Sequence, residues 1–400
     1  MTDWKDYALK LIPVLLVFGG LVQIVPLLVF LERKICAWAQ DRVGPNRVGL
    51  FGPDSPLEIL GINSGKTRFL GGLMQPLADA IKLFTKEVFM PTGADTVLFT
   101  MAPFFALMPP IIAFVVIPVG SDFTLPWGSE TDPNQVRTVM MQVANLNIGI
   151  LFLLGVASLS AYGLAFGGWA SNNKFALLGG VRAMAQMISY EIGMGIVILA
   201  MIMQYHSFSM REMVLCQVES HNAYTNAIWG WGCFHQPLAF ILFVICAFAE
   251  NNRLPFDLPE CEAELIGGFH TEFNSMGFGM FFQGEYIAML SMGALIATMF
   301  FGGWHYPGFA TVHAASPFIA MVLSLVSFSI KVMGFACFSM WVRWSLPRFR
   351  WDQLMSIGWK TVVPLALANL LLTAFLNIDD GVKKLPAQAA KTTTMVDVRR

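Results

Sequence analysis

Residues 183–199, AMAQMISYEIGMGIVIL, decide the fold class of this chain. They hold a single charged residue, Glu191, among mainly apolar side chains, and the apolar run extends over residues 179–203. A helix needs about 20 mostly apolar residues to cross a bilayer, so we predict a membrane-spanning helix here. A carboxylate near the centre of such a helix costs about 2.5–3.5 kcal/mol, so Glu191 needs a partner, water or a proton that offsets this cost.

The composition extends this interpretation to the whole chain. Of its 400 residues, 56% are hydrophobic and 13% charged, whereas a soluble domain has about 25% charged residues. The net charge of −1 gives no basic field that would attract nucleic acid. The six cysteines form no CxxC pair, so we expect no metal, haem or iron–sulfur ligand set. The sequence predicts an all-α polytopic membrane protein.

Eight apolar runs are candidates for membrane spans. We expect one membrane domain, residues 1–376, with a polar and poorly ordered tail over residues 377–400. The predicted spans lie near residues 10–31, 97–119, 146–168, 179–203, 237–249, 284–304, 317–341 and 357–376.

The distribution of basic residues predicts the orientation. The loops on one side of the predicted bundle carry 15 Lys and Arg residues, and the loops on the other side carry 2. The basic side is therefore the cytoplasmic or matrix side, and both termini face the opposite side.

The loop after the fifth span is unusually acidic. Residues 249–273, AENNRLPFDLPECEAELIGGFHTEF, carry six acids against one base, Arg253. Pro255 and Pro259 prevent a helix across the first part, so we predict a structured loop. Clustered carboxylates in a place of low dielectric constant raise one another's pKa values and share their protons. Such a group can exchange a proton when a nearby charge changes, as a proton relay does.

The end of this acidic loop has a simpler alternative interpretation. Asp257 is a candidate N-cap, and the following Glu260 and Glu264 would share one helix face while Glu262 lies on the other. Acids near a helix start are favourable, so a short solvated helix is the alternative to a buried relay. Apolar neighbours such as Phe256 argue against simple solvation.

Three more charged residues border or interrupt the spans. Glu250 closes the fifth span, Glu285 opens the sixth, and Lys331 lies inside the seventh. Lys331 and a glutamate that faces the same bundle interior could form a buried pair. The sequence leaves open which glutamate that would be.

Two cytoplasmic segments suggest contact surfaces. Residues 72–87, GLMQPLADAIKLFTKE, predict an amphipathic helix that lies in the membrane interface, with Asp79 unexpectedly placed among its apolar residues. Residues 342–355, VRWSLPRFRWDQLM, combine Arg343, Arg348 and Arg350 with aromatic residues. This pattern fits either ordinary positive-inside bias or a docking face for another subunit.

Together these motifs resemble one family, the H subunit (chain 1) of respiratory complex I, NADH:quinone oxidoreductase. The resemblance covers roughly residues 25 to 356 in the order of the family. The stretches that carry it are LERK, DRVGPNRVG, MQPLADAIKL, YGLAFGGWASNNKFALLGGVRAMAQMISYE, AENNRLPFDLPECEAELIGGFHTEF, GEYIAML, FFGGW and PRFRWDQLM.

The resemblance implies a subunit without a redox centre or catalytic group of its own. It would join the membrane arm to the hydrophilic arm, form much of the quinone chamber, and begin the acidic path toward the proton pumps. Quinone would be a substrate shared with the partner subunits, and no cofactor would be covalently bound. The implied proton-transfer positions are Glu32, Asp79, Glu191, Glu250, Glu260, Glu262, Glu264 and Glu285, and our reading of the spans adds Lys331. The implied quinone-facing set is Arg33, Asp79, Phe256 and Arg348.

The chain also departs from the family pattern. Residues 51–70 form an insertion, and the third span lacks an acid, so any family carboxylate there is either missing or replaced by Asn145 or Asn147. Two other functions remain open at this point: the ion-coupling membrane subunit of an energy-converting hydrogenase, and a standalone ion transporter. We expect a bacterial cytoplasmic membrane, or the mitochondrial inner membrane for an organellar protein.

Overall fold

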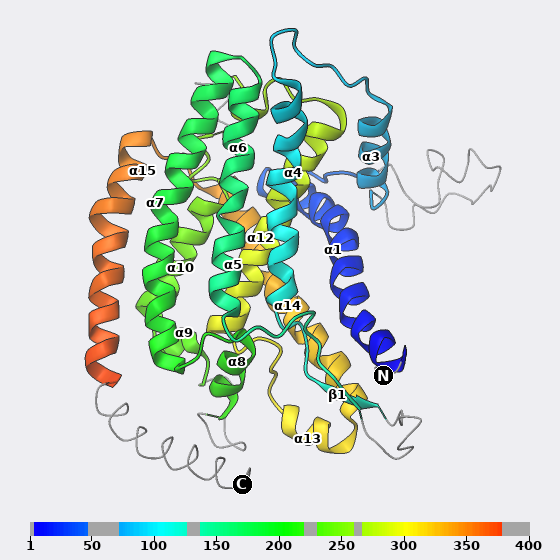
Figure 1. The fold of residues 1–400 in the computed structure, drawn as a ribbon, viewed down its shortest axis with the longest axis vertical. Helices are drawn as coiled ribbons and strands as arrows, with labels where there is room; N and C mark the ends of the chain where they lie inside the picture. The colour runs from blue at the N-terminus through cyan, green and yellow to red at the C-terminus, as the bar shows by residue number, and fades with distance from the viewer. Residues whose placement is uncertain (1–3, 47–71, 126–136, 220–229, 260–265, 378–400) are drawn as a thin grey trace, which may run out of the picture.

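The computed structural model describes residues 4–46, 72–125, 137–219, 230–259 and 266–377. Within these residues, seven helices are long and apolar enough to cross a membrane, and they stand side by side in one bundle (Figure 1). The shorter apolar helix α10 (Pro237–Glu250) stands among them. The seven are α1 (Trp4–Ala39), α4 (Thr96–Ala113) with the 3-10 turn η1 (Phe114–Val116), α5 (Gly149–Ala157) with α6 (Leu159–Ala170), α7 (Lys174–Tyr205), α12 (Ser275–Phe300), α14 (Pro317–Ser345), and the last helix, Trp351–Asn377, which begins with α15 (Trp351–Ile357) and the π-helical turn η3 (Gly358–Val362).

The predicted fold class, an all-α polytopic membrane protein, is confirmed by this bundle. The sequence missed one small feature, an antiparallel pair of strands, β1 (Phe123–Leu125) and β2 (Arg137–Val139). Glu285 does not open its helix as predicted, because α12 already begins at Ser275. The phenylalanines of this first part of α12 pack on other aromatic rings, for example Phe281 on Phe273 at 4.9 Å, and this packing supports the longer helix.

The connections gather at the two ends of the bundle. α3 (Gln75–Thr85) and the connections after α1, α6, α10 and α14 lie at the upper end in Figure 1. The lower end holds β1, the ends of the described chain, and α8 (Met210–Glu219), α9 (Gly232–His235) and α13 (Phe309–Ala315). This grouping of the connections matches the two sides predicted from the Lys and Arg counts.

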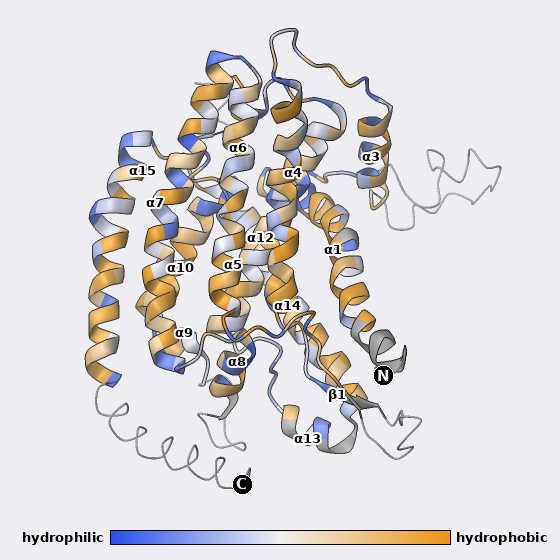
Figure 2. Ribbon diagram, viewed as in Figure 1, coloured by the Kyte–Doolittle hydropathy of each residue, from blue (hydrophilic) through white to orange (hydrophobic). Residues whose placement is uncertain are grey.

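The predicted amphipathic helix is α3, which has Pro76 in its first turn. None of its residues is buried, and Leu77, Ile81 and Phe84 expose their side chains. Apolar residues also cover the outer faces of the long helices, and polar ones concentrate at the bundle ends (Figure 2). The polar tail was predicted to begin at residue 377, but the last helix includes Asn377. The rest of the tail, residues 378–400, and the insertion, residues 51–70, lie outside the described part of the chain.

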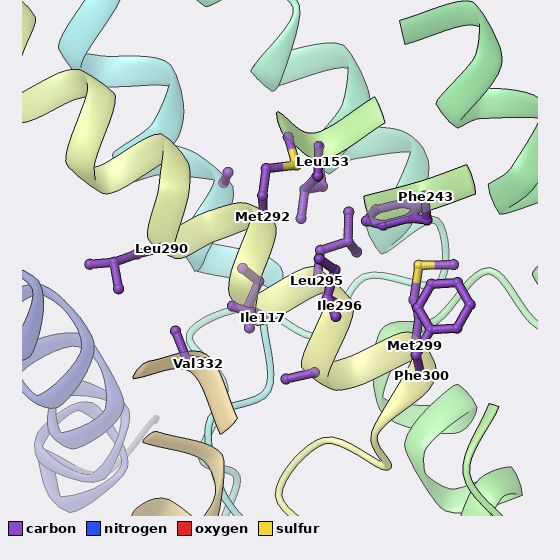
Figure 3. Packing of buried hydrophobic residues seen from close by; sticks show 14 of the residues in the cluster. Ile117, Leu153, Phe243, Leu290, Met292, Leu295, Ile296, Met299, Phe300 and Val332 are labelled. Atoms are coloured by element: carbon purple, nitrogen blue, oxygen red, sulfur yellow. The ribbon is translucent and has the colours of Figure 1, made fainter. Parts of the chain in front are cut away.

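The core is centred on α12. Around it, Ile117, Leu153, Phe243 and Val332 from other segments pack against Leu295, Met299 and their neighbours (Figure 3). Two glycines bring helices close together: a Cβ on Gly163 would lie 2.5 Å from the Ala106 nitrogen, and one on Gly284 would lie 2.8 Å from the Ala106 oxygen. α4 therefore packs tightly against both α6 and α12, and this packing fixes the position of Glu285, the residue after Gly284.

Candidate functional site

Five ionisable side chains from four segments meet inside the upper half of the bundle, and we name them the charge cluster. They are Glu32 of α1, Arg253 of the loop after α10, Glu285 and Tyr286 of α12, and Arg343 of α14. Arg253 Nε donates to Glu285 Oε1 at 2.7 Å, and Arg253 Nη1 lies 3.4 Å from Glu32 Oε2. Arg343 Nη1 lies 3.0 Å from Glu32 Oε1 and 3.5 Å from Glu285 Oε1. The Tyr286 hydroxyl donates to Glu32 Oε2 at 2.5 Å.

The cluster balances two carboxylates with two guanidinium groups. The side chain of Arg253 is completely buried, and its guanidinium also lies over the Tyr286 ring, 4.8 Å from the centroid. Burial alone would lower the pKa of Arg253, but the Glu285 and Glu32 carboxylates outweigh it and raise that pKa above its ordinary value. A charge so deeply buried is tolerated only when it is paired, so Arg253 and the two glutamates depend on one another.

A cavity of about 260 Å³ lies on one side of the charge cluster, between α4, α5, α6 and α12. Its polar lining includes Glu250, Asn251 and Asn252 from the end of α10, and Glu285 and Arg343 from the cluster. We name it the acid chamber. Two of the predicted proton-transfer residues, Glu250 and Glu285, thus face one space. Glu191 of α7 lies close enough to Glu250 for their charges to interact.

A larger crevice, of about 540 Å³, lies on the other side of the cluster, between α1, α3, α12 and α14. Glu32, Arg33, Gln75 and Tyr286 give it polar groups. Arg33 Nη2 lies 2.6 Å from Asp79 Oδ2, and Gln75 Nε2 donates to the other oxygen of the same carboxylate at 3.2 Å. Asp79, unexpected on an amphipathic helix, therefore ties α3 to α1. We name this space the crevice.

The charge cluster separates the two cavities. Glu32 and Tyr286 line the crevice, Glu285 and Arg343 line the acid chamber, and Phe282 lines both. Arg343, which contacts both carboxylates, therefore bridges one cavity to the other.

A second ion pair lies next to the cluster. Arg348 Nη2 donates to Asp257 Oδ2 at 3.1 Å, so Asp257 has an ion-pair partner in addition to its predicted capping role. Burial raises the pKa of Asp257, although Arg348 and Arg343 act to lower it. Phe256 is buried between the rings of Tyr190 and Phe349, at 5.7 and 5.5 Å, and it is not among the residues that line the crevice.

Lys331 is not part of this site. Its ammonium donates to the carbonyl oxygens of Phe301, Gly303 and His305 at 2.6–2.8 Å, and it lies 4.7 Å from the Trp231 ring centroid. The expectation that Lys331 pairs with a glutamate is therefore wrong for the described part of the chain. The reason is that backbone carbonyls need donors when they are removed from water, and Lys331 supplies a donor to three carbonyls of the segment that follows α12.

Other predicted positions have different outcomes. Glu260, Glu262 and Glu264 lie outside the described residues. Asn145 and Asn147 precede α5 in an exposed segment, so neither replaces a carboxylate inside the third span. Ser160 of α6 faces the acid chamber instead.

Sequence reasoning assigned no site role to Arg253, Tyr286, Asn251 or Asn252, and it treated Arg343 only as part of a docking face. One signal was present: Arg253 is the only Lys or Arg among the six acids of residues 249–273. A lone base in an acidic, proline-rich loop that must be partly buried is a good candidate for a buried counter-ion.

The fold and the site define a polytopic membrane protein with ionisable groups buried between its helices. A sequence model of the family described as NADH dehydrogenase matches residues 12–374. The NADH-quinone oxidoreductase H subunit 1 of Geobacter metallireducens is 45% identical over 371 residues, which are 93% of this chain and 97% of that protein. The NADH-quinone oxidoreductase H subunit of Bdellovibrio bacteriovorus is 44% identical and covers 90% of this chain and 94% of its own length. The chain belongs to the family of NADH-quinone oxidoreductase H subunits, as the sequence motifs indicated.

Proposed function

We propose that this chain binds quinone in the crevice and passes the charge change of quinone reduction to the acid chamber through the charge cluster. The observation that carries the proposal is the position of the cluster, with Glu32 on the crevice side, Glu285 on the chamber side and Arg343 within 3.5 Å of both. A new negative charge or a proton in the crevice would change the pairing of Arg343, and Glu285 would respond.

The crevice suits a substrate with a polar head and an apolar tail. Arg33, which Asp79 pairs with, and Gln75 supply polar groups to its lining, while Val29, Phe282 and Trp344 supply apolar contact. α1 and α14 expose many apolar side chains toward the surrounding bilayer, so a lipid-soluble quinone could reach the space from the membrane. Phe256 and Arg348 remain predicted members of the quinone-binding set. The chain itself supplies no redox centre in this proposal.

The proposed proton route joins the charge cluster to the acid chamber. Glu32, Glu285, Glu250 and Glu191 form its described part, with Asp79 beside the crevice. Glu260, Glu262, Glu264 and Lys331 remain further predicted members of the route. Partner subunits of the hydrophilic arm would carry the electrons, and small membrane subunits would continue the route. The relatives are bacterial, and we place the chain in the bacterial cytoplasmic membrane.

Glu285→Gln tests the proposal in the assembled complex. The amide keeps the shape but cannot exchange a proton, and a positioned proton-transfer group typically contributes about 100-fold or more to a rate. Arg253 and Arg343 both keep the Glu32 carboxylate as a partner in this variant, so we expect assembly to persist while NADH:quinone turnover and proton pumping fall together. Glu87→Gln is the matched control, because Glu87 is exposed outside both cavities. Wild-type turnover and pumping in Glu285→Gln would refute the proposal.

A further inference from the structure

Three consecutive residues at the end of α10 leave buried acceptor atoms without partners. Glu250 Oε2, Asn251 Oδ1 and Asn252 Oδ1 are each buried and have no hydrogen-bond donor among the described residues. The Glu250 and Asn251 residues are more than nine-tenths buried. Buried acceptors are nearly always satisfied in folded proteins, so each exception calls for a donor such as an ordered water.

All three residues line the acid chamber. The chamber volume of about 260 Å³ is well above the ~10–15 Å³ that one water needs. A buried water also needs two to four polar partners, and the three unpaired acceptors of Glu250, Asn251 and Asn252 supply them. The chamber is therefore both large enough and polar enough to hold several ordered waters.

The rest of the polar lining favours the same occupant. The Ser160 hydroxyl donates to the Ala157 carbonyl at the end of α5 at 2.7 Å, and the Ser291 hydroxyl donates to the Ala288 carbonyl of α12 at 2.8 Å, so both oxygens offer lone pairs to the chamber. Arg343 and His270 also line the chamber, and Arg343 is engaged with Glu32 and Glu285. Walls rich in acceptors orient water hydrogens outward and stabilise an excess proton.

We propose that Asn251 and Asn252 are positioning residues that seat the proton-carrying water between Glu250 and Glu285. A proton leaves the Glu250 carboxyl for this water, and an equivalent proton passes from the water to the Glu285 carboxylate, so the water keeps its own proton count. The inference rests on the proposed function and assigns the water-binding role to two residues that do not themselves titrate.

Asn252 offers a matched pair of variants. Its φ of +50° lies in the left-handed region, which glycine, aspartate and asparagine adopt more readily than other residues. Asn252→Gly therefore keeps the backbone and removes the acceptor, whereas Asn252→Asp keeps both. Asn251→Ala and Asn251→Asp make the same comparison at a position with ordinary φ.

The experiment uses the whole complex in sealed native membranes. Assembly is checked by native gels and by NADH oxidation with a water-soluble acceptor, which bypasses quinone. We expect Asn252→Gly and Asn251→Ala to lower NADH:quinone turnover about tenfold, the effect of one lost buried hydrogen bond, and to increase the solvent deuterium isotope effect. The two Asp variants should recover most of the rate.

Two results would overturn the inference. One is wild-type turnover and isotope effect in Asn252→Gly and Asn251→Ala, and the other is equal impairment of the Gly, Ala and Asp variants, which would indicate a merely structural role. Glu250→Gln separates this failure from failure of the proposed function. If Glu250→Gln is impaired while the asparagine variants are normal, only the water-positioning role is lost. If Glu250→Gln is also normal, the proton route itself is wrong.

Discussion

Arg253 and Glu285 form a 2.7 Å ion pair in which the arginine side chain is completely buried. Arg253 also lies near Glu32, and Arg343 completes a circuit that joins α1, α12, α14 and the loop after α10. This circuit forms the partition between the crevice and the acid chamber. A charge change on one side can reach the other by altering one of these pairs, which is why we place the coupling step here.

The first prediction concerns the stability of this partition. Arg253→Met leaves two buried carboxylates without their cation, and breaking a buried pair from one side costs about 3–5 kcal/mol. We expect a clear loss of assembled complex, measured by native gels and by thermal inactivation. Arg253→Lys should be intermediate, because a lysine keeps the charge but cannot reach both carboxylates with a rigid fork.

Arg350→Met is the control for this prediction. Arg350 also pairs with a carboxylate, that of Asp352 at 3.2 Å, but its side chain is 78% exposed. Exposed ion pairs contribute little to stability, so this variant should assemble normally. Equal stability of Arg253→Met and Arg350→Met would contradict a structural role of the buried pair.

The second prediction concerns Glu191. Glu191→Gln removes the ionisable group that interacts with Glu250 from α7 and keeps the side-chain volume. We expect the complex to assemble, with quinone-linked turnover and pumping impaired by about 100-fold if Glu191 is an obligatory proton-transfer group. Normal pumping by Glu191→Gln would remove this residue from the route.

A third prediction follows from His305 at the lower end of the bundle. Burial, and then the charge of Lys331, lower the pKa of His305 to about 4 from an ordinary value of 6.5. Folding therefore favours the neutral imidazole. The contribution of His305 to the free energy of unfolding is complete above pH 6.5. It is lost as the pH falls from 6.5 toward 4, because the unfolded state then binds more protons than the folded state.

The measurement for His305 is the rate of thermal inactivation of the complex between pH 4 and pH 7. Wild-type protein should lose stability on the order of 3 kcal/mol across the window from pH 6.5 to pH 4. His305→Asn has no titrating group, so its contribution to this pH dependence should disappear. Identical pH profiles for the two proteins would show that His305 does not titrate differently on folding.

The sequence was informative where a single residue contradicts its surroundings. Glu191 and Glu250 were found because carboxylates are rare in apolar spans, and Asp79 because it interrupts an amphipathic pattern. The partners of these residues were not predictable in the same way. Arg343 contacts Glu32 across 311 residues of sequence, and no periodicity within one span carries information about such a pairing.

Two of the wrong predictions concern the start of the third span and the kind of group that pairs with Lys331. The third span was expected to begin at residue 146, but α5 begins at Gly149, so Asn147 lies outside the helix. The partner of Lys331 was sought among carboxylates, whereas carbonyls after α12 satisfy it. Backbone carbonyls are the same for every residue, so the sequence pattern gives no sign of them.

The last prediction separates two roles of Lys331. If this residue only anchors the chain after α12, Lys331→Arg should keep both assembly and pumping, since arginine can still donate to the carbonyls of Phe301, Gly303 and His305. If it transfers protons, the same variant should assemble but fail to pump, because arginine does not release its proton in proteins. Lys331→Met should destabilise the complex in either case, since it leaves these carbonyls without their donor at about 1–3 kcal/mol for each buried group that becomes unpaired. The three carbonyl contacts at 2.6–2.8 Å support the anchoring role, and a stable Lys331→Arg complex without pumping would show that Lys331 also carries protons, as its predicted place in the route requires.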